Sequence, residues 1–225
     1  MLTVDNNGAR RAVVQRDAHN LTPEQVQREY PAVQSAMLKE LQTWAKLKCF
    51  SRKKRSEARN IIDTRWVLKY KWEHPTTDAT KASGGGRLTG SAGPVRTIRA
   101  RLTVRGFKDT DRQNVDKYAG TSTRMSQKVL VSEAVKHGWT IMTTDISKAF
   151  LQGVTYEELS KLTGEPQREV NFFLPASNIK LLQKIPGFEN FDPVTEVLSM
   201  TKAIYGLKNA PRAWRKKLLM VLTEF

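Results

Sequence analysis

Residues 98–108 read Ile98-Arg99-Ala100-Arg101-Leu102-Thr103-Val104-Arg105-Gly106-Phe107-Lys108, and the first eight alternate strictly between two kinds of side chain. Successive side chains of a β-strand point to opposite faces of its sheet. One face would therefore carry Ile, Ala, Leu and Val, and the other would carry three arginines and a threonine. The pattern predicts a strand with one face toward a core and a basic opposite face.

A second alternating stretch, residues 65–72, precedes this one. Trp66, Leu68, Tyr70 and Trp72 share one face, and the other holds Arg65, Lys69 and Lys71 together with Val67. Residues 75–94 between the stretches are rich in Gly, Ser and Thr, which is typical of a flexible loop. The two stretches predict an antiparallel hairpin. Like charges across strands repel, so a phosphate-bearing partner would explain the basic face; an ordinary solvated strand face is the alternative.

The positive charge is concentrated. The chain has 225 residues and a net charge of +16, and residues 46–112 hold 18 Lys/Arg against 6 Asp/Glu, which is +12 of that total. Such a field attracts polyanions, and their binding is salt-dependent through counterion release. Nucleic acid is the expected partner; a solvated basic surface or a nuclear-targeting run is the alternative.

Other classes of protein fit less well. The single cysteine, Cys49, excludes an intrachain disulfide and agrees with an intracellular location. The three histidines show no zinc-ligand spacing, and no apolar run approaches the length of a membrane span. We therefore expect no membrane partner.

Helices are expected at several places. Thr22-Pro23-Glu24-Gln25 has the residues of a capped helix start, after a polar leader of about 20 residues that we expect to be disordered. Apolar residues at helical spacing predict an amphipathic helix from Ala32 to about Leu47. A further helix is expected over residues 126–136. Another begins near Ala210, and its buried side would hold Trp214, Leu218, Val221 or Leu222, and Phe225.

Elsewhere the expected structure is less regular. Residues 52–55 read Arg-Lys-Lys-Arg and suggest a basic loop. Residues 140–146 suggest a strand that ends near Asp145. Residues 155–195 mix charge, Pro and Gly, so we expect loops and short strands there.

Two further segments add to the first segment (residues 98–108). The second segment (residues 144–153) reads Thr144-Asp145-Ile146-Ser147-Lys148-Ala149-Phe150-Leu151-Gln152-Gly153. The third segment (residues 203–214) reads Ala203-Ile204-Tyr205-Gly206-Leu207-Lys208-Asn209-Ala210-Pro211-Arg212-Ala213-Trp214. In this order they resemble the strand, turn and helix start of copia-type retrotransposon reverse transcriptases. Residues 66–71 resemble the strand that precedes them in that family, and Pro186-Gly187-Phe188 resembles its "PPGF" element.

The resemblance implies an α+β fold with an antiparallel sheet and packed helices, in which residues 31–225 are a reverse transcriptase domain that is incomplete at its C-terminus. Residues 31–135 would be the fingers and residues 136–225 part of the palm. Residues 1–30 would be a disordered or short-helix leader. The implied function is RNA-directed DNA polymerisation, with RNA template, RNA/DNA hybrid and deoxynucleoside triphosphate as partners. The rest of a Pol polyprotein is a further candidate partner.

Asp145 is the candidate catalytic residue. Nucleotidyl transfer needs carboxylates that hold two divalent ions, Mg²⁺ or Mn²⁺, and a carboxylate at the end of a strand suits this task. By resemblance, the backbone carbonyl of Ile146 would be a further ligand. The alternative is an ordinary strand-end or helix-capping aspartate.

Other side chains are candidates for substrate contact. By resemblance, Phe150 would pack under the sugar of the incoming nucleotide and disfavour a 2'-hydroxyl, unless it is a plain core residue. Tyr205 and Gly206 would pack against the nascent base pair. Arg99 and Arg101 are candidates for the triphosphate, because guanidinium groups match phosphate oxygens. Contacts to nucleic acid are expected from the remaining basic residues: Arg65, Lys69, Lys71, Arg105, Lys108, Lys208 and Arg212.

The family's Asp-Asp motif has no counterpart, because the chain contains no Asp-Asp pair and its last aspartate is Asp192. We therefore expect a fragment that is inactive by itself, with two ions bound only in a complete enzyme. The alternatives are a basic remnant that only binds nucleic acid and an unrelated basic protein. By resemblance the location would be a cytoplasmic particle or the nucleus.

Overall fold

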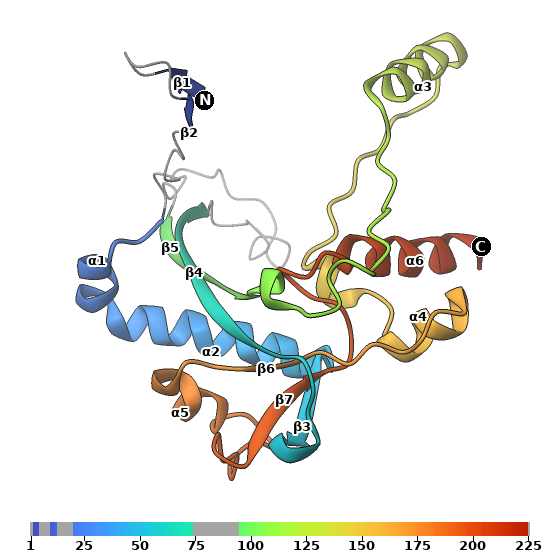
Figure 1. The fold of residues 1–225 in the computed structure, drawn as a ribbon. Coiled ribbons are helices and arrows are strands. Elements are labelled where there is room, and N and C mark those ends of the chain that lie inside the picture. Colours follow the sequence, from blue (N-terminus) through green and yellow to red (C-terminus); the bar gives the residue numbers. More distant parts are fainter. Residues whose placement is uncertain (1, 5–9, 13–19, 74–94, 225) are drawn as a thin grey trace, which may run out of the picture. The chain divides into compact units, whose positions relative to one another are not determined.

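The computed structural model describes residues 2–4, 10–12, 20–73 and 95–224 (Figure 1). Within these ranges the chain is α+β, as predicted, with six α-helices and a mixed five-stranded sheet of order β3-β7-β6-β4-β5. The sheet is not wholly antiparallel, because β4 and β6 run parallel. The predicted loop over residues 75–94 lies outside the described residues.

The strands and helices have the following bounds. The strands are β1 (Leu2–Val4), β2 (Arg10–Ala12), β3 (Phe50–Lys54), β4 (Ile61–Glu73), β5 (Val95–Val104), β6 (Asn171–Phe173) and β7 (Glu196–Met200). The helices are α1 (Pro23–Arg28), α2 (Tyr30–Lys46), α3 (Arg124–His137), α4 (Tyr156–Thr163), α5 (Ile179–Leu182) and α6 (Ala210–Thr223). None of the helices in the described part of the chain is long and apolar enough to cross a membrane.

The chain divides into two compact units. The first unit comprises Met1–Glu40 and Trp66–Leu102, and the second comprises Leu41–Arg65 and Thr103–Phe225. The predicted division into fingers and palm, with its boundary near residue 135, stays a prediction.

The first unit contains the predicted helix start and most of the two alternating strands. Thr22 caps α1, and Thr22 and Gln25 exchange the two hydrogen bonds of a capping box, as the sequence predicted. Glu29 accepts a hydrogen bond from Tyr70 of β4 at 2.7 Å and pairs with Arg96 of β5 at 3.2 Å. These contacts fasten the start of α2 to the outer part of the hairpin.

In the leader, β1 and β2 form a short antiparallel pair where the sequence suggested disorder. The other residues before position 20 lie outside the described ranges.

The core of the second unit is aromatic. Trp44 of α2 and Phe50 of β3 each pack against Phe172 of β6, with ring centroids 6.0 and 5.8 Å apart. Phe188, from the Pro186-Gly187-Phe188 element, packs against Phe50 at 5.1 Å. Aromatic pairs of this geometry add stability beyond the area that they bury, so this element has a packing role here.

The segment Arg52–Arg55 is not the predicted loop. Residues 52–54 belong to β3, which pairs antiparallel with β7. Neighbouring acids balance the positive charges: Arg52 pairs with Glu196 at 2.7 Å, and Lys53 pairs with Glu169 at 2.7 Å. Because Arg52 and Lys53 each have an acidic neighbour, this part of the basic run can lie in a sheet.

Glu169 makes stability depend on acid pH. The hydrogen bond from Lys53, then those from the Arg59 backbone and from Asn171, lower the pKa of Glu169 from 4.5 to about 2. A lowered folded-state pKa gives stability that is present above pH 4.5 and is lost as the pH falls toward 2. We expect Glu169→Gln to flatten this part of the stability–pH curve by on the order of 1 kcal/mol, because solvent screens a partly exposed carboxylate. Urea unfolding at several acidic pH values measures this, and parallel curves for the two proteins would contradict it.

Three further predictions need correction. Residues 140–146 form no strand, and in the described chain no neighbouring strand offers them hydrogen bonds. Helix α4 stands in a region where only loops and short strands were expected. On α6, Trp214 and Leu218 are half-buried as predicted, but Val221 and Leu222 are exposed; Phe225 lies outside the described residues.

Candidate functional site

Two glycines bring the first and third segments into contact. Gly106 follows β5, and Gly206 has the positive φ of +99° that glycine tolerates best. A Cβ on Gly106 would lie 2.1 Å from the carbonyl oxygen of Gly206, and a Cβ on Gly206 would lie 2.1 Å from that of Val104. The Val104 amide also donates to the Tyr205 carbonyl at 3.0 Å. This backbone-to-backbone approach, the glycine contact, fixes residues 103–108 against residues 204–207.

The end of the second segment lies beside the third segment, next to the glycine contact. The rings of Phe150 and Tyr205 lie 5.9 Å apart at a tilt of 56°. Beyond Phe150, the amide of Val154 donates to the Ala213 carbonyl at 3.3 Å, so the turn rests on the start of α6. Three predicted nucleotide contacts, Phe150, Tyr205 and Gly206, are therefore neighbours.

Two of the predicted phosphate-binding cations share one acid. Arg105 pairs with Asp63 of β4 at 3.2 Å, and Lys108 pairs with the same carboxylate at 3.0 Å. Burial alone would raise the pKa of Asp63, but Lys108 and Arg105 outweigh burial and hold this pKa below its usual value. The carboxylate thus remains charged near neutral pH.

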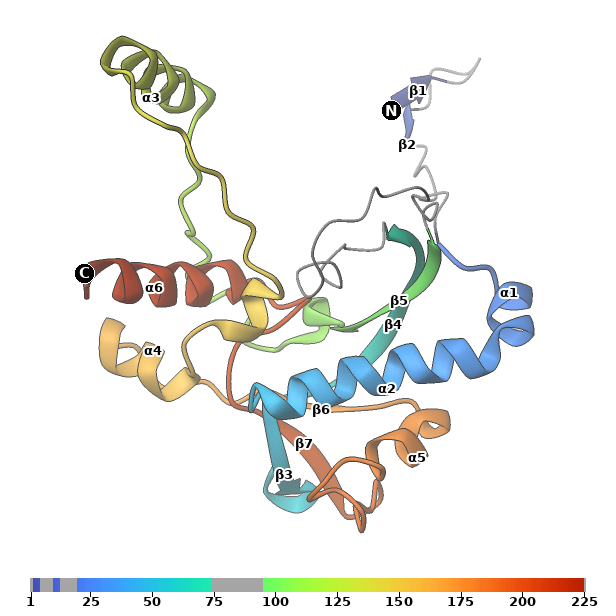
Figure 2. The same ribbon diagram turned by 180° about the vertical axis from the view of Figure 1, so that it is seen from behind.

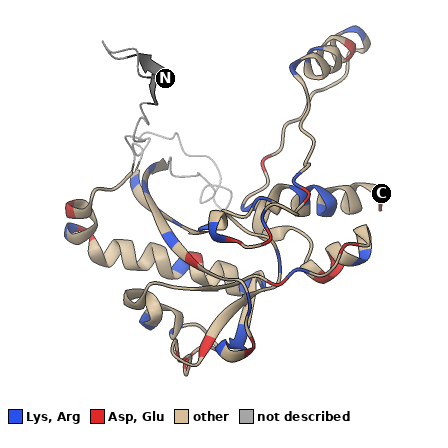
Figure 3. Ribbon diagram, in the orientation of Figure 1, with Lys and Arg blue, Asp and Glu red and all other residues tan. Residues whose placement is uncertain are grey.

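The other predicted basic contacts are mostly on the surface. In the second unit, Arg65 and Lys208 are exposed. In the first unit, Arg99, Arg101 and Lys71 are exposed and Lys69 is half-buried, while the other face of β5 buries Ala100 and Leu102. The predicted alternation of β5 is thereby confirmed, and Figure 3 marks the basic residues in blue.

Asp145 and Ile146 lie on irregular chain between α3 and the turn at Phe150. Both are exposed, and no sheet edge carries them. Within the described ranges, no three His, Cys, Asp or Glu side chains come together in a way that could hold a metal ion. The predicted position of Asp145 at a strand end is therefore wrong for this structure.

Comparison with known proteins gives relatives that include two plant Pol polyproteins. The retrovirus-related Pol polyprotein from transposon RE2 of Arabidopsis thaliana is 31% identical over 128 residues, which are 55% of this chain and 7% of that protein. The corresponding polyprotein from transposon RE1 of the same plant is 30% identical over 158 residues, 68% of this chain and 8% of that protein. No protein-family model and no solved structure matches.

The chain belongs to the copia-type retrotransposon Pol polyproteins. It spans less than a tenth of the length of these two relatives. The predicted origin from a copia-type Pol polyprotein is confirmed, and the reverse transcriptase assignment stays a prediction.

One residue of this Pol chain has a different environment from the one expected. Arg212 of the third segment is buried, and its guanidinium binds Glu165 through two hydrogen bonds of 2.7 and 2.9 Å and pairs with Asp116 at 3.2 Å. The side chain is 9% exposed and each of its three guanidinium nitrogens already has an acidic partner, so it offers little surface to a phosphate. The geometry therefore indicates a structural role for Arg212 in place of the predicted contact to nucleic acid.

The metal site implied by the resemblance does not fit the described part of the Pol chain. Two clamped ions need several carboxylates around one point. Asp145 stands on an exposed irregular segment without such a group.

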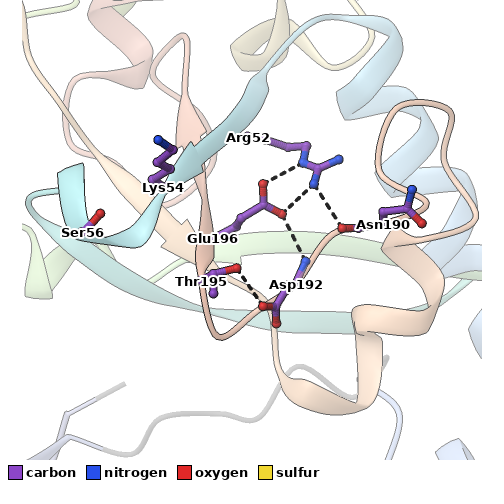
Figure 4. A pocket seen from close by; sticks show the side chains of 7 residues that line it. All are labelled: Arg52, Lys54, Ser56, Asn190, Asp192, Thr195 and Glu196. Atoms are coloured by element: carbon purple, nitrogen blue, oxygen red, sulfur yellow. Dashed lines mark hydrogen bonds and ion pairs between the residues drawn. The ribbon is translucent and has the colours of Figure 1, made fainter.

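Two polar features escaped sequence reasoning. A small cavity near Arg212 is lined by Tyr156, Arg168 and Asn209, and each of them has a buried polar atom without a partner. Figure 2 shows the ribbon of α4 and α6, to which Tyr156 and Arg212 belong. A shallow pocket of about 450 Å³ lies where β3 meets β7; Figure 4 shows the Arg52–Glu196 pair within it. No predicted site residue lines the second pocket.

Asp63 was also missed. The sequence signal was a single acid, Asp63, just before the basic alternating stretch, where cations on neighbouring strands need a counter-charge.

Proposed function

We propose that this chain supplies the template-, primer- and nucleotide-contacting part of an RNA-directed DNA polymerase. In that reaction a primer 3'-hydroxyl attacks the innermost phosphate of a deoxynucleoside triphosphate, and catalysis consists mostly of positioning and charge stabilisation. The observation that carries the proposal is the glycine contact together with the Phe150–Tyr205 pair. Three segments that are far apart in sequence meet there, and each contributes a candidate substrate contact.

The chain's own residues would have distinct tasks. Arg105 and Lys108 would bind phosphate oxygens, the guanidinium through paired donors and the ammonium as a point charge. Phe150 and Tyr205 would offer ring surfaces to the sugar and base of the nucleotide. Gly206, which has no side chain, would let backbone come close to that base pair. The exposed Arg65 and Lys208 would add contacts to the backbone of an RNA template or RNA/DNA hybrid.

The chemical step needs more than these residues. Asp145 and the carbonyl of Ile146 remain the proposed ligands for Mg²⁺ or Mn²⁺, but the described residues form no group of three metal-ligating side chains there. We therefore propose that the chain by itself binds nucleic acid and does not polymerise. This favours the second candidate function, a basic module that binds without a metal ion, for the isolated chain.

Binding of a fluorescent RNA/DNA hybrid at several salt concentrations tests the proposed function. For the wild type we expect affinity to fall steeply with salt. The double variant Arg105→Gln/Lys108→Gln should bind roughly tenfold more weakly near 0.1 M salt, with a log–log salt slope shallower by about two.

A second double variant controls for net charge. Lys54→Gln/Lys161→Gln also removes two positive charges, from side chains that are 75% and 74% exposed. Its affinity should stay close to that of the wild type. Equal weakening in both double variants would show that only net charge matters, and this would contradict the proposed contacts.

A further inference from the structure

Asp63 occupies an unusual position among the basic residues of the second unit. Its side chain is 19% exposed, whereas those of Arg105 and Lys108 are 41% and 48% exposed. The acid is thus more buried than either of the two cations that pair with it. The three side chains together carry one net positive charge.

The backbone around these residues is fixed independently of the charges. The Arg105 amide donates to the Asp63 carbonyl at 3.0 Å, and the Lys108 amide donates to the Arg105 carbonyl at 2.9 Å. Residues 106–108 form a 3₁₀ helix that begins at the glycine contact. The Cα positions of Arg105 and Lys108 are therefore set, but their long side chains would lose much rotamer freedom on binding a ligand.

A carboxylate that both cations share reduces the rotamer freedom that Arg105 and Lys108 lose on binding a ligand. Guanidinium has five N–H donors and ammonium has three, so one carboxylate cannot take them all. With each cation in an ion pair with Asp63, donors remain for an outside anion. Binding then orders less side chain than it would with two free cations, which is the general advantage of preorganisation.

We infer that Asp63 is a positioning residue that holds Arg105 and Lys108 together as a two-cation cradle for a phosphate group. The phosphate could belong to a nucleic-acid backbone or to a nucleoside triphosphate, since both present the same oxygens. The inference rests on the proposed function and deepens it.

Net charge alone would have the opposite effect on the affinity for a phosphate-bearing ligand. Removal of an acid from a basic surface raises the net positive charge, and it should tighten the binding of any polyanion. If Asp63 holds the cradle, Asp63→Asn should instead weaken binding by roughly threefold to tenfold, in the range measured for coupled neighbouring residues. The sign of the change thus separates the two explanations.

The experiment measures the affinity of the 225-residue chain for a labelled RNA/DNA hybrid and, separately, for labelled dATP. The Asp63→Asn variant is compared with Asp111→Asn, which removes a nearby acid whose side chain contacts Thr110 and neither cation. We expect Asp63→Asn to weaken binding and to flatten the salt slope by about one contact, and Asp111→Asn to bind as well as the wild type or slightly better. If Asp63→Asn weakens binding of the hybrid alone, the cradle holds a backbone phosphate of nucleic acid. If it weakens binding of dATP alone, the cradle holds a triphosphate.

Asp63→Glu guards against misfolding, which circular dichroism monitors in each variant. It keeps the charge but moves the carboxylate by one methylene group, so a cradle predicts weaker binding and a pure charge effect predicts no change. Tighter binding by Asp63→Asn would overturn the inference. If Asp63→Asn does not fold, wild-type affinity of Asp63→Glu would overturn it. In both cases the proposed function would stand. A wild type that binds neither probe would overturn both.

Discussion

Replacement of Gly206 by alanine is expected to destabilise the second unit by about 3–5 kcal/mol, as the sum of backbone strain and overpacking. The residue has a φ of +99°, which L side chains rarely adopt. Its new Cβ would meet the Val104 carbonyl oxygen at 2.1 Å and a methyl group of Thr103 at 2.9 Å. Because a backbone atom is the nearest neighbour, no side-chain rotation can relieve the clash. Urea unfolding followed by circular dichroism measures the loss.

Gly164 provides the matched control. It ends α4 with a φ of +71°, and a Cβ there would meet nothing within 4 Å. Gly164→Ala should therefore cost only the strain of the left-handed backbone, about 1–2 kcal/mol. Equal losses for the two variants would show that the first and third segments are not in contact.

The second large effect is expected at Arg168. Its guanidinium pairs at 2.6 Å with Asp109, which is 4% exposed. Asp109 otherwise accepts hydrogen bonds from the Asn60 side chain and the Asp111 amide. Arg168→Met should lower the free energy of unfolding by about 3 kcal/mol, because it leaves a buried carboxylate without its counter-charge.

Two comparisons identify the cause. Adding Asp109→Asn to Arg168→Met should restore part of the stability, since the uncompensated charge is then gone. Lys161→Met breaks an exposed pair with Glu157 and should change stability little. If the double variant is less stable than Arg168→Met alone, the loss arises from packing and the assignment to buried charge is wrong.

Sequence reasoning succeeded where the pattern was local. The alternation in residues 65–72 and 98–105 predicted β4 and β5, because strand periodicity is visible in a single stretch. The apolar spacing from Val33 to Trp44 predicted the buried face of α2 for the same reason. Helix α4 was missed although Thr155 and Glu158 form a capping box and Gly164 ends the helix. That signal was present in a region where frequent Pro and Gly suggested loops.

Prediction from sequence failed where a residue far away in the chain decides the local structure or the role of a side chain. Residues 140–146 have strand composition, but a strand needs a neighbour, and composition cannot supply one. By residue type and position Arg212 was predicted to bind phosphate, but in the structure it donates a hydrogen bond to Glu165, which lies 47 residues earlier in the sequence. Asp63 likewise lies on β4, whereas Arg105 directly follows β5. Such pairings depend on tertiary structure, so one sequence alone could not give the charge balance of the site.

Primer extension tests the central claim most directly. The 225-residue chain is mixed with an RNA template, a labelled DNA primer, deoxynucleotides and Mg²⁺ or Mn²⁺, at a protein concentration at which a parallel binding measurement shows the hybrid to be saturated. We expect a bound hybrid and an unextended primer, because the described residues gather no set of carboxylates around Asp145. Primer extension that Asp145→Asn abolishes would contradict this and would show that the chain itself completes a catalytic metal site.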